Sequence, residues 1–186
     1  MSSKETPFCH ISGRKITASD GFLLEIPESE EFFTAVYEKI GLNYPKYFKM
    51  NPLCKLAIIA AELTLRQALK VAPLHPATAL VLTTRNGSLD TDERYWQSTA
   101  AIPSPGLFVY TLANVMAGEI CIRYGIKGEN YCFVTEGFNR DFHEQQTQLL
   151  RKAHKANFIL NGYADHLHGK SEAFFYFVAP ENEKTT

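Results

Sequence analysis

Apolar residues follow two patterns along the chain, and the first, short continuous runs, predicts strands. Short, nearly continuous apolar runs are typical of strands that a sheet buries on both faces. The clearest covers residues 78–84, and three similar runs follow later in the chain. Near the start, two apolar runs flank the turn Ser12-Gly13, which predicts a hairpin. The later strands are predicted at 131–134, 157–160 and 173–178, and the hairpin at 8–11 and 15–17.

The second pattern, apolar residues spaced three and four apart, predicts helices. The strongest begins at Asn51-Pro52, an N-cap followed by proline at the first helical position, and buries a face between Leu53 and Leu69. Two more are predicted over 111–124 and 142–156, and residues 20–50 predict a short helix with an aromatic-rich loop. Glu62 with Arg66, and Glu119 with Arg123, stand four apart and are expected to pair on outer helix faces.

From residue 53 onward the predicted strands and helices alternate, which is the pattern of an α/β fold. We therefore expect a mainly parallel, five-stranded sheet with helices on both faces, right-handed crossovers and room for one antiparallel strand. The sequence contains no internal repeat and no low-complexity linker. A single domain over residues 1–186 is expected, with its core between about 53 and 179.

Composition narrows the classes of function. The chain has a formal net charge of −1, which gives no electrostatic basis for binding nucleic acid or an anionic membrane. We expect a cytoplasmic protein, because the sequence shows neither a secretory leader nor the ~20 apolar residues of a membrane span. The four cysteines, Cys9, Cys54, Cys121 and Cys132, have no C-x-x-C spacing and are expected to be buried free thiols.

The stretch from residue 102 to residue 139 is the candidate centre of function. It predicts a loop, a helix that ends at Gly125, a tight turn, and a short apolar strand followed by Thr135-Glu136-Gly137. In a parallel α/β sheet, chemistry lies at the carboxyl ends of strands. The position where a reactive side chain would stand is therefore Gly137, which has no side chain.

These residues resemble the amino-terminal half of β-ketoacyl-ACP synthases, which have the thiolase-like fold. The resemblance covers residues 53–169 and rests on three segments: a strand and loop, TTRNGSLDTD, a helix segment, SPGLFVYTLANVMAGEI, and a turn, YGIKGEN. The pairing of the helix with the turn is fairly specific. In that family the turn leads through a short strand to Thr-Ala-Cys, whose cysteine is the nucleophile of an acyltransferase.

The departures from this pattern concern the reacting group. Counting from Gly128, the family's nucleophilic cysteine falls on Gly137 and the preceding alanine on Glu136, while Thr135 is retained. In the family, a thiolate at a helix N-terminus forms the acyl-enzyme. Glycine has no nucleophile, so we expect no catalytic residue at this position. The family's two histidines and its lysine come from a second half, which we expect to be missing because the chain ends at Thr186.

Chain-length factors are the branch of this family that lacks the cysteine. They carry Glu followed by Gln at the Ala-Cys pair and dimerise with an active ketosynthase; Glu136 fits that pattern and Gly137 does not. The resemblance implies a non-catalytic subunit of a fatty acid or polyketide system of the aryl-polyene type. Its partners would be a ketosynthase and an acyl carrier protein, and no cofactor or metal is implied.

The same resemblance implies which residues would meet the substrate or the partner. The family's dimer interface and acyl pocket correspond to five positions, namely Phe108, Thr111, Asn114, Thr135 and Glu136. For the first three, plain core packing is an equal alternative, since the centres of interfaces resemble interiors. An independent argument is that half of a thiolase-like chain leaves an apolar layer uncovered, unless residues 20–50 cover it. We expect pairing through an edge strand at 131–134.

Three other interpretations are open. The chain could be an acyl-transfer or condensing enzyme that uses Cys132 or residues of a partner, although a strand's two-residue period points Cys132 away from Gly137. It could be a homodimeric module that binds an acyl chain. His166 and His168 lie two apart, which puts both on one face of an extended strand, so that with Asp165 they could hold a metal; a solvated loop is the favoured interpretation.

Overall fold

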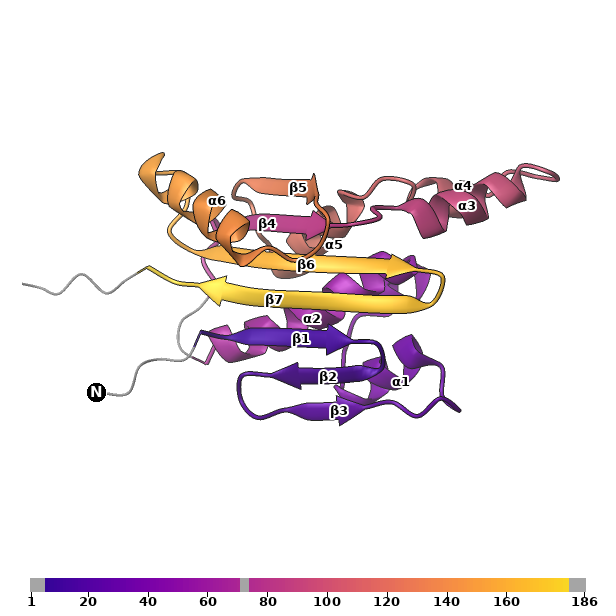
Figure 1. Cartoon of the computed structure of the whole chain (residues 1–186), viewed down its shortest axis with the longest axis horizontal. Coiled ribbons are helices and arrows are strands. Elements are labelled where there is room, and N and C mark those ends of the chain that lie inside the picture. Colours follow the sequence, from indigo (N-terminus) through magenta and orange to yellow (C-terminus); the bar gives the residue numbers. More distant parts are fainter. Residues whose placement is uncertain (1–5, 71–73, 181–186) are drawn as a thin grey trace, which may run out of the picture.

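A computed structural model describes residues 6–70 and 74–180. A single sheet runs through this part of the chain, with the strand order β3-β2-β1-β7-β6-β4-β5 (Figure 1). Residues 1–5, 71–73 and 181–186 of the expected domain lie outside the described residues. The strands are β1 (Phe8–Ser12), β2 (Lys15–Ala18), β3 (Leu23–Glu25), β4 (Ala79–Thr84), β5 (Asn130–Val134), β6 (Ile159–Leu167) and β7 (Lys170–Val178).

The directions of the strands confirm the α/β class. β4 pairs in parallel with β5 and with β6, whereas β7 pairs antiparallel with both β6 and β1. Within these five strands, β7 is therefore the single antiparallel one. Over the whole sheet only two of the six neighbouring pairs are parallel, so the sheet is mixed and not mainly parallel as expected. The sheet has seven strands instead of the expected five, because the predicted hairpin β1–β2 joins it through β7 and the unpredicted β3 adds an edge strand. β3 escapes a periodicity search since it is three residues long and two of them are exposed.

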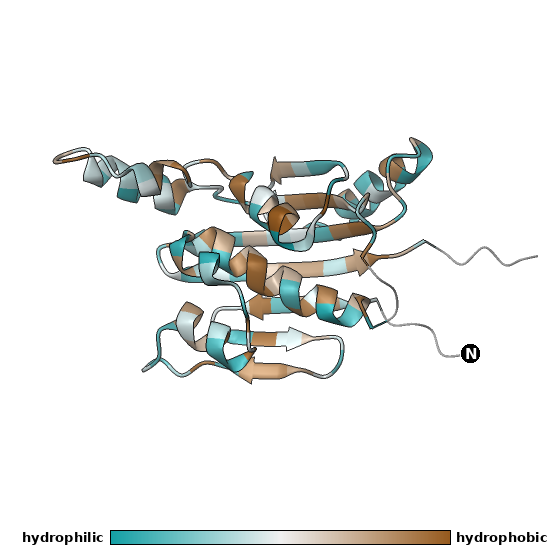
Figure 2. Cartoon of the chain, turned by 180° about the vertical axis from the view of Figure 1, so that it is seen from behind, coloured by the Kyte–Doolittle hydropathy of each residue, from teal (hydrophilic) through white to brown (hydrophobic). Residues whose placement is uncertain are grey.

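One face of the sheet is covered by the helices α1 (Phe32–Lys39), α2 (Pro52–Ala68) and α5 (Val115–Tyr124), and by the 3-10 turn η1 (Pro45–Lys49). α2 lies across the strands (Figure 2). The amide of Cys54 donates to the Asn51 side chain at 2.9 Å, which confirms the predicted cap. α2 is buried on nearly all sides, and Phe33, Val36 and Tyr47 belong to the same apolar cluster as its buried residues. Residues 20–50 therefore cover part of the apolar layer, which is the alternative that the sequence analysis considered.

The charged residues on these helices form longer-range contacts than the sequence predicts. Arg66 does bind Glu62, at 2.8 Å between Nε and Oε1, but Glu62 is buried and also binds Arg123 at 2.6 Å. Glu119 does not pair with Arg123; it accepts from Tyr110 and lies 2.7 Å from Lys46 Nζ. Burial and the bonds from Tyr124 and the arginines act in opposite directions on Glu62, and its pKa is lowered overall. The buried ion pair between Glu62 and Arg123 therefore joins α2 to α5 and does not lie on the surface of α5 alone.

The other face of the sheet carries α6 (Arg140–Lys152), which confirms helices on both faces. α6 lies on β4 through a smaller apolar cluster that includes Val81, Leu150 and Ile159. Next to it is a buried polar group: His143 Nε2 lies 3.0 Å from Thr83 Oγ1, and His143 Nδ1 lies 3.4 Å from Asn161 Oδ1. Burial lowers the pKa of His143 to about 4. This imidazole is therefore neutral at physiological pH.

The pKa of His143 predicts a loss of stability in mild acid. The usual value is 6.5 and the folded value about 4, so below pH 6.5 the unfolded chain binds a proton that the folded chain excludes. Stability should therefore fall as the pH drops from 6.5 to 4, by about 3 kcal/mol in total. Urea unfolding at intermediate pH values measures it. His143→Gln should flatten the slope; a residual slope is expected from His166, whose pKa burial also lowers. An unchanged slope in His143→Gln would contradict the assignment.

Two helices, α3 (Leu89–Ser98) and α4 (Pro105–Phe108), lie outside the two helical layers. They follow the carboxyl end of β4 and extend beyond the ends of the strands (Figure 1). We call residues 89–112 the arm. The expected loop at 105–108 is instead a short helix, capped by Ser104, whose Oγ accepts from the amide of Leu107 at 3.3 Å. Among the described residues, no helix is both long and apolar enough to cross a membrane.

Candidate functional site

Gly137 lies in the connection between β5 and α6, where the sequence places it. β5 ends at Val134, and the amide of Thr135 continues the ladder by donating to the carbonyl of Thr84 at 2.9 Å. α6 starts after Asn139, whose side chain accepts from the amide of Phe142 at 3.0 Å. Within the connection, Thr135 Oγ1 donates to the Gly137 carbonyl at 3.0 Å. The backbone at Gly137 is therefore held at a strand-to-helix junction, at the carboxyl end of a parallel strand.

The missing side chain at Gly137 is not a consequence of crowding. A Cβ atom built there meets nothing within 4 Å, and the residue does not have the positive φ that favours glycine. Glu136 beside it is exposed, and Thr135 and Gly137 are half-buried. A larger residue would fit at position 137, so the site has room for a nucleophile that this chain does not provide.

Phe138 is the residue of this junction that the sequence analysis did not single out. Its ring packs on Phe174 of β7, with centroids 4.7 Å apart, and on the ring of His143 at 5.5 Å. The aromatic side chain thus ties the junction to the sheet face that carries α6. No periodic pattern could have found it, because its contact with β7 depends on how distant strands are ordered in the sheet.

The thiols of the chain are poor nucleophiles where they stand. Burial raises the pKa of Cys132 to about 11 and also raises the pKa values of Cys9, Cys54 and Cys121. All four are free, as expected, but only Cys9 and Cys54 are fully buried, whereas Cys121 and Cys132 are partly exposed. Cys132 packs against the cluster that contains α2, while Phe133 next to it packs on the α6 side. The thiol of Cys132 therefore faces away from the helix that follows Gly137, as the strand period predicts.

The loop after β4 is fixed at the same end of the sheet by one carboxylate. Asp165 of β6 accepts from Thr84 Oγ1 and from the amide and side chain of Asn86, at 3.0, 2.7 and 2.6 Å. It also accepts from the amide of Arg85 at 3.1 Å. The Asp165 carboxylate therefore fixes the loop that leads from β4 into the arm.

The predicted interface residues Phe108, Thr111 and Asn114 lie at the base of the arm and just after it. Phe108 is exposed and its ring contacts that of Tyr95 at 5.4 Å, and Asn114 at the start of α5 is exposed without a capping hydrogen bond from its side chain. Thr111 donates to the Phe108 carbonyl at 2.8 Å. This segment meets the loop after β4, since a Cβ on Gly87 would lie 3.5 Å from Ala113. The three residues are thus surface residues and do not form part of the core.

His166 and His168 do not form a metal site. His166 is buried against the ring of Phe33, and its Nδ1 lies 2.8 Å from Ser171 Oγ. His168 is in the turn after β6, with a φ of 49°, and its Nε2 lies 2.7 Å from the Glu93 carboxylate. The extended backbone that would put both rings on one face ends between them. In the described part of the chain, no three acidic, histidine or cysteine side chains are grouped to hold a metal ion.

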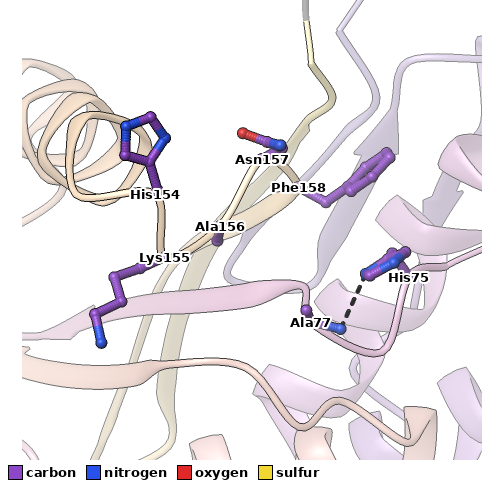
Figure 3. Close-up of a pocket in the computed structure, with 7 residues that line it drawn as sticks. All are labelled: His75, Ala77, His154, Lys155, Ala156, Asn157 and Phe158. Atoms are coloured by element: carbon purple, nitrogen blue, oxygen red, sulfur yellow. Dashed lines mark hydrogen bonds between the residues drawn. The ribbon is translucent and has the colours of Figure 1, made fainter.

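A hollow of about 260 Å³ lies at the opposite end of the sheet, before β4 and β6 (Figure 3). His75 stacks on Phe158 and its Nδ1 accepts from the amide of Ala77 at 3.1 Å. His154 and Lys155 point in different directions from it (Figure 3). Its basic side chains do not converge on one point, and it is remote from the carboxyl ends of the strands. We therefore place the candidate site at the junction around Gly137.

Comparison with known proteins finds similarity among solved structures. No protein-family model matches it, and no curated protein does. Among solved structures it is similar to the ishigamide ketosynthase/chain length factor, with a TM-score of 0.73 and 17% identity over 97% of this chain. It covers 62% of that chain, so it spans less than two thirds of it.

Two further structures are complexes. One is the ketosynthase ApeO in complex with its chain length factor ApeC, from Xenorhabdus doucetiae, with a TM-score of 0.60, 15% identity and coverage of 96% of this chain and 80% of that one. The other is AntDE:AntF, a type II polyketide acyl-carrier protein with its ketosynthase, with a TM-score of 0.60, 12% identity and coverage of 94% and 61%. These similarities establish the thiolase-like fold of ketosynthases and chain length factors, as the sequence resemblance implies.

Proposed function

We propose that this chain, which has a ketosynthase fold, is a non-catalytic, chain-length-factor-like subunit. It pairs with a catalytic β-ketoacyl-ACP synthase in the cytoplasm and helps bound the acyl chain that an acyl carrier protein presents. The pathway class is fatty acid or polyketide assembly, of the aryl-polyene type by resemblance. The observation that carries the proposal is the glycine at the strand-to-helix junction, where the fold has space for a nucleophile.

The edge of the sheet supports the pairing. β5 is the last strand of the sheet, and Tyr131 and Val134 on it are exposed. An edge strand with unpaired backbone groups is a template for pairing with another chain. A partner that adds its own β5 there would place the two Gly137 junctions on one continuous sheet.

The alternative function is acyl transfer by this chain alone, and the raised pKa of Cys132 makes it unfavourable. A pKa of about 11 leaves Cys132 almost wholly protonated at neutral pH, and the thiolate is the nucleophile. Incubation with an acyl-carrier thioester should therefore leave the mass of the isolated chain unchanged. A stable acyl adduct on Cys132 would overturn this conclusion.

Coexpression with a catalytic β-ketoacyl-ACP synthase from the same organism tests the pairing. We expect the two chains to copurify at one-to-one stoichiometry and to elute together in size-exclusion chromatography. A chain that stays alone, or that pairs only with itself in the presence of the ketosynthase, would refute the proposed function. The second result would favour a homodimeric acyl-binding module.

A cysteine at position 137 should be reactive without harming the fold. The Cβ of Gly137→Cys would meet nothing within 4 Å and the backbone has no positive φ, so stability should change by less than about 0.5 kcal/mol. An ordinary thiol pKa of about 8.5 against about 11 for Cys132 implies roughly a hundredfold faster alkylation at pH 7.5. Iodoacetamide labelling read by peptide mass spectrometry measures the ratio, with Cys132→Ser as the background control. Equal rates at both positions would mean that the junction is closed to reagents.

A further inference from the structure

The two faces of the sheet are covered unequally. α1, α2, α5 and η1 pack on one face through the larger apolar cluster, to which most residues of α2 belong (Figure 2). α6 lies on the other face (Figure 1), and among the described residues of this helix only Leu150 belongs to the smaller cluster beneath it. Leu149 beside it is 58% exposed. Because stabilisation by burial scales with apolar area, α6 is held on the sheet far less firmly than α2.

A buried polar group also holds α6 on the sheet. His143 is fully buried, and its ring nitrogens lie 3.0 Å from Thr83 Oγ1 on β4 and 3.4 Å from Asn161 Oδ1 on β6. One helical turn further along, Thr147 Oγ1 accepts from Asn161 Nδ2 at 3.1 Å. These hydrogen bonds join the helix to two neighbouring strands. Leaving their buried partners unpaired would cost free energy, so the intact group fixes α6 in place.

The imidazole of His143 has no counter-charge in this position. From β7, the ring of Tyr176 packs on it at 6.2 Å, and burial raises the pKa of Tyr176 to about 12, so that phenol is neutral. Phe138 faces it from the junction. Arg140, over the Tyr176 ring, is positive and pairs with the exposed Glu144. Within the described part of the chain, no carboxylate pairs with His143, so a proton there would be a buried, unpaired charge.

We propose that α6 is a pH-operated flap: a proton on His143 releases it from the sheet, while the helices on the other face stay in place. Release takes the imidazole into water, where its charged form is favoured, and breaks the bonds to Thr83 and Asn161 together. The helix would move on its two connections, residues 135–139 and 153–158. The first contains Gly137, where a Cβ would meet nothing within 4 Å. The inference goes beyond the proposed function and does not depend on which partner the chain has.

The size of the effect follows from proton linkage. The released ring has the usual pKa of 6.5, and burial lowers this to about 4 in the docked helix. Below pH 6.5 the released form therefore binds a proton that the docked form excludes, and release becomes easier as the pH falls. Between pH 7 and pH 5 the equilibrium should shift toward the released form by about 20-fold.

Amide hydrogen exchange at pH 7 and pH 5, corrected for the intrinsic rate at each pH, measures this release. The amides of α6 should exchange through a local opening and lose about 20-fold in protection at pH 5. Local opening exposes little surface, so low urea should leave their exchange unchanged, whereas it should accelerate exchange in α2, which needs global unfolding. Equal sensitivity to urea in α6 and α2 at pH 5 would mean that α6 opens only with the whole fold, and would overturn the proposal.

Two histidine variants separate the flap from a general sensitivity to acid. His143→Gln keeps hydrogen-bonding atoms but no titrating ring, so it should abolish the loss of protection in α6 at pH 5. His166→Gln is the matched control, because His166 is also buried with a lowered pKa but packs against Phe33 on the opposite face of the sheet. It should leave the pH response of α6 unchanged. A wild-type response in His143→Gln, or its loss in His166→Gln, would refute the role of His143.

Discussion

Replacing Val134 by proline should abolish pairing with the ketosynthase while leaving the fold intact. The amides of β5 alternate between β4 and the open edge. That of Thr135 donates to Thr84 on β4, so the amide of Val134 points outward. Proline at 134 therefore removes a donor from the free edge without costing a bond to β4. We expect affinity to fall at least about 100-fold, or about 3 kcal/mol, measured by analytical ultracentrifugation of the mixed chains.

Two control variants accompany this experiment. Leu23→Lys lies at the other edge of the sheet, on β3, where Leu23 is 62% exposed; it should leave pairing unchanged. Phe133→Pro removes an amide that faces β4, and it should unfold the chain instead of sparing it. If Val134→Pro pairs as well as the wild type, the β5 edge is not the interface. If Leu23→Lys also disrupts pairing, the interface lies elsewhere on the sheet.

Gly128→Ala should strongly destabilise the fold, because the added methyl group would clash with backbone atoms. Gly128 precedes β5, and a Cβ there would lie 2.8 Å from the Ala77 carbonyl oxygen and closer still to that of Thr78. Both atoms are backbone at the start of β4, so neither can rotate away. The β4–β5 ladder begins at this contact, with the amide of Leu80 donating to the Glu129 carbonyl at 2.9 Å. We expect a loss of about 3 kcal/mol or more, with a melting midpoint lower by about 6–12 °C.

The matched control for this substitution lies on α5. Gly118 is a helical glycine with nothing within 4 Å of its missing Cβ and no positive φ. Gly118→Ala should therefore stabilise the chain by about 0.5–1 kcal/mol, because alanine is the better helix former. Thermal unfolding of both variants gives opposite signs for the same chemical change. A Gly128→Ala variant as stable as the wild type would mean that the turn can move away from β4.

Much of the fold could be predicted because its central elements carry strong local signals. β4 is buried at every position, as its unbroken apolar run indicates, and α2 begins at the Asn51 cap that the sequence displays. The turn that ends α5 has Gly125 in the left-handed region, with a φ of 66°. These features depend on residues that are near one another in sequence. Periodicity and capping therefore suffice to place them.

What could not be predicted depends on contacts between distant segments. Glu119 finds Lys46 and Tyr110 instead of Arg123, because α5 lies next to η1 in the fold. Phe138 packs on β7 for a similar reason. The position of Gly137 at a strand end could be predicted from the local pattern. The contacts that hold this junction, such as Phe138 on Phe174, could not. A single sequence shows which residues alternate or repeat, but not which distant segments become neighbours.

The two ends of the sheet differ, and this difference limits how large an assembly can grow. β5 offers five residues for pairing, whereas β3 offers three. A sheet with two equally open borders could add subunits without end and form fibres. With one border blunted, addition stops once the first contact is made. If β5 is the interface, as we propose, the shorter β3 border favours a closed pair over an assembly that grows without end.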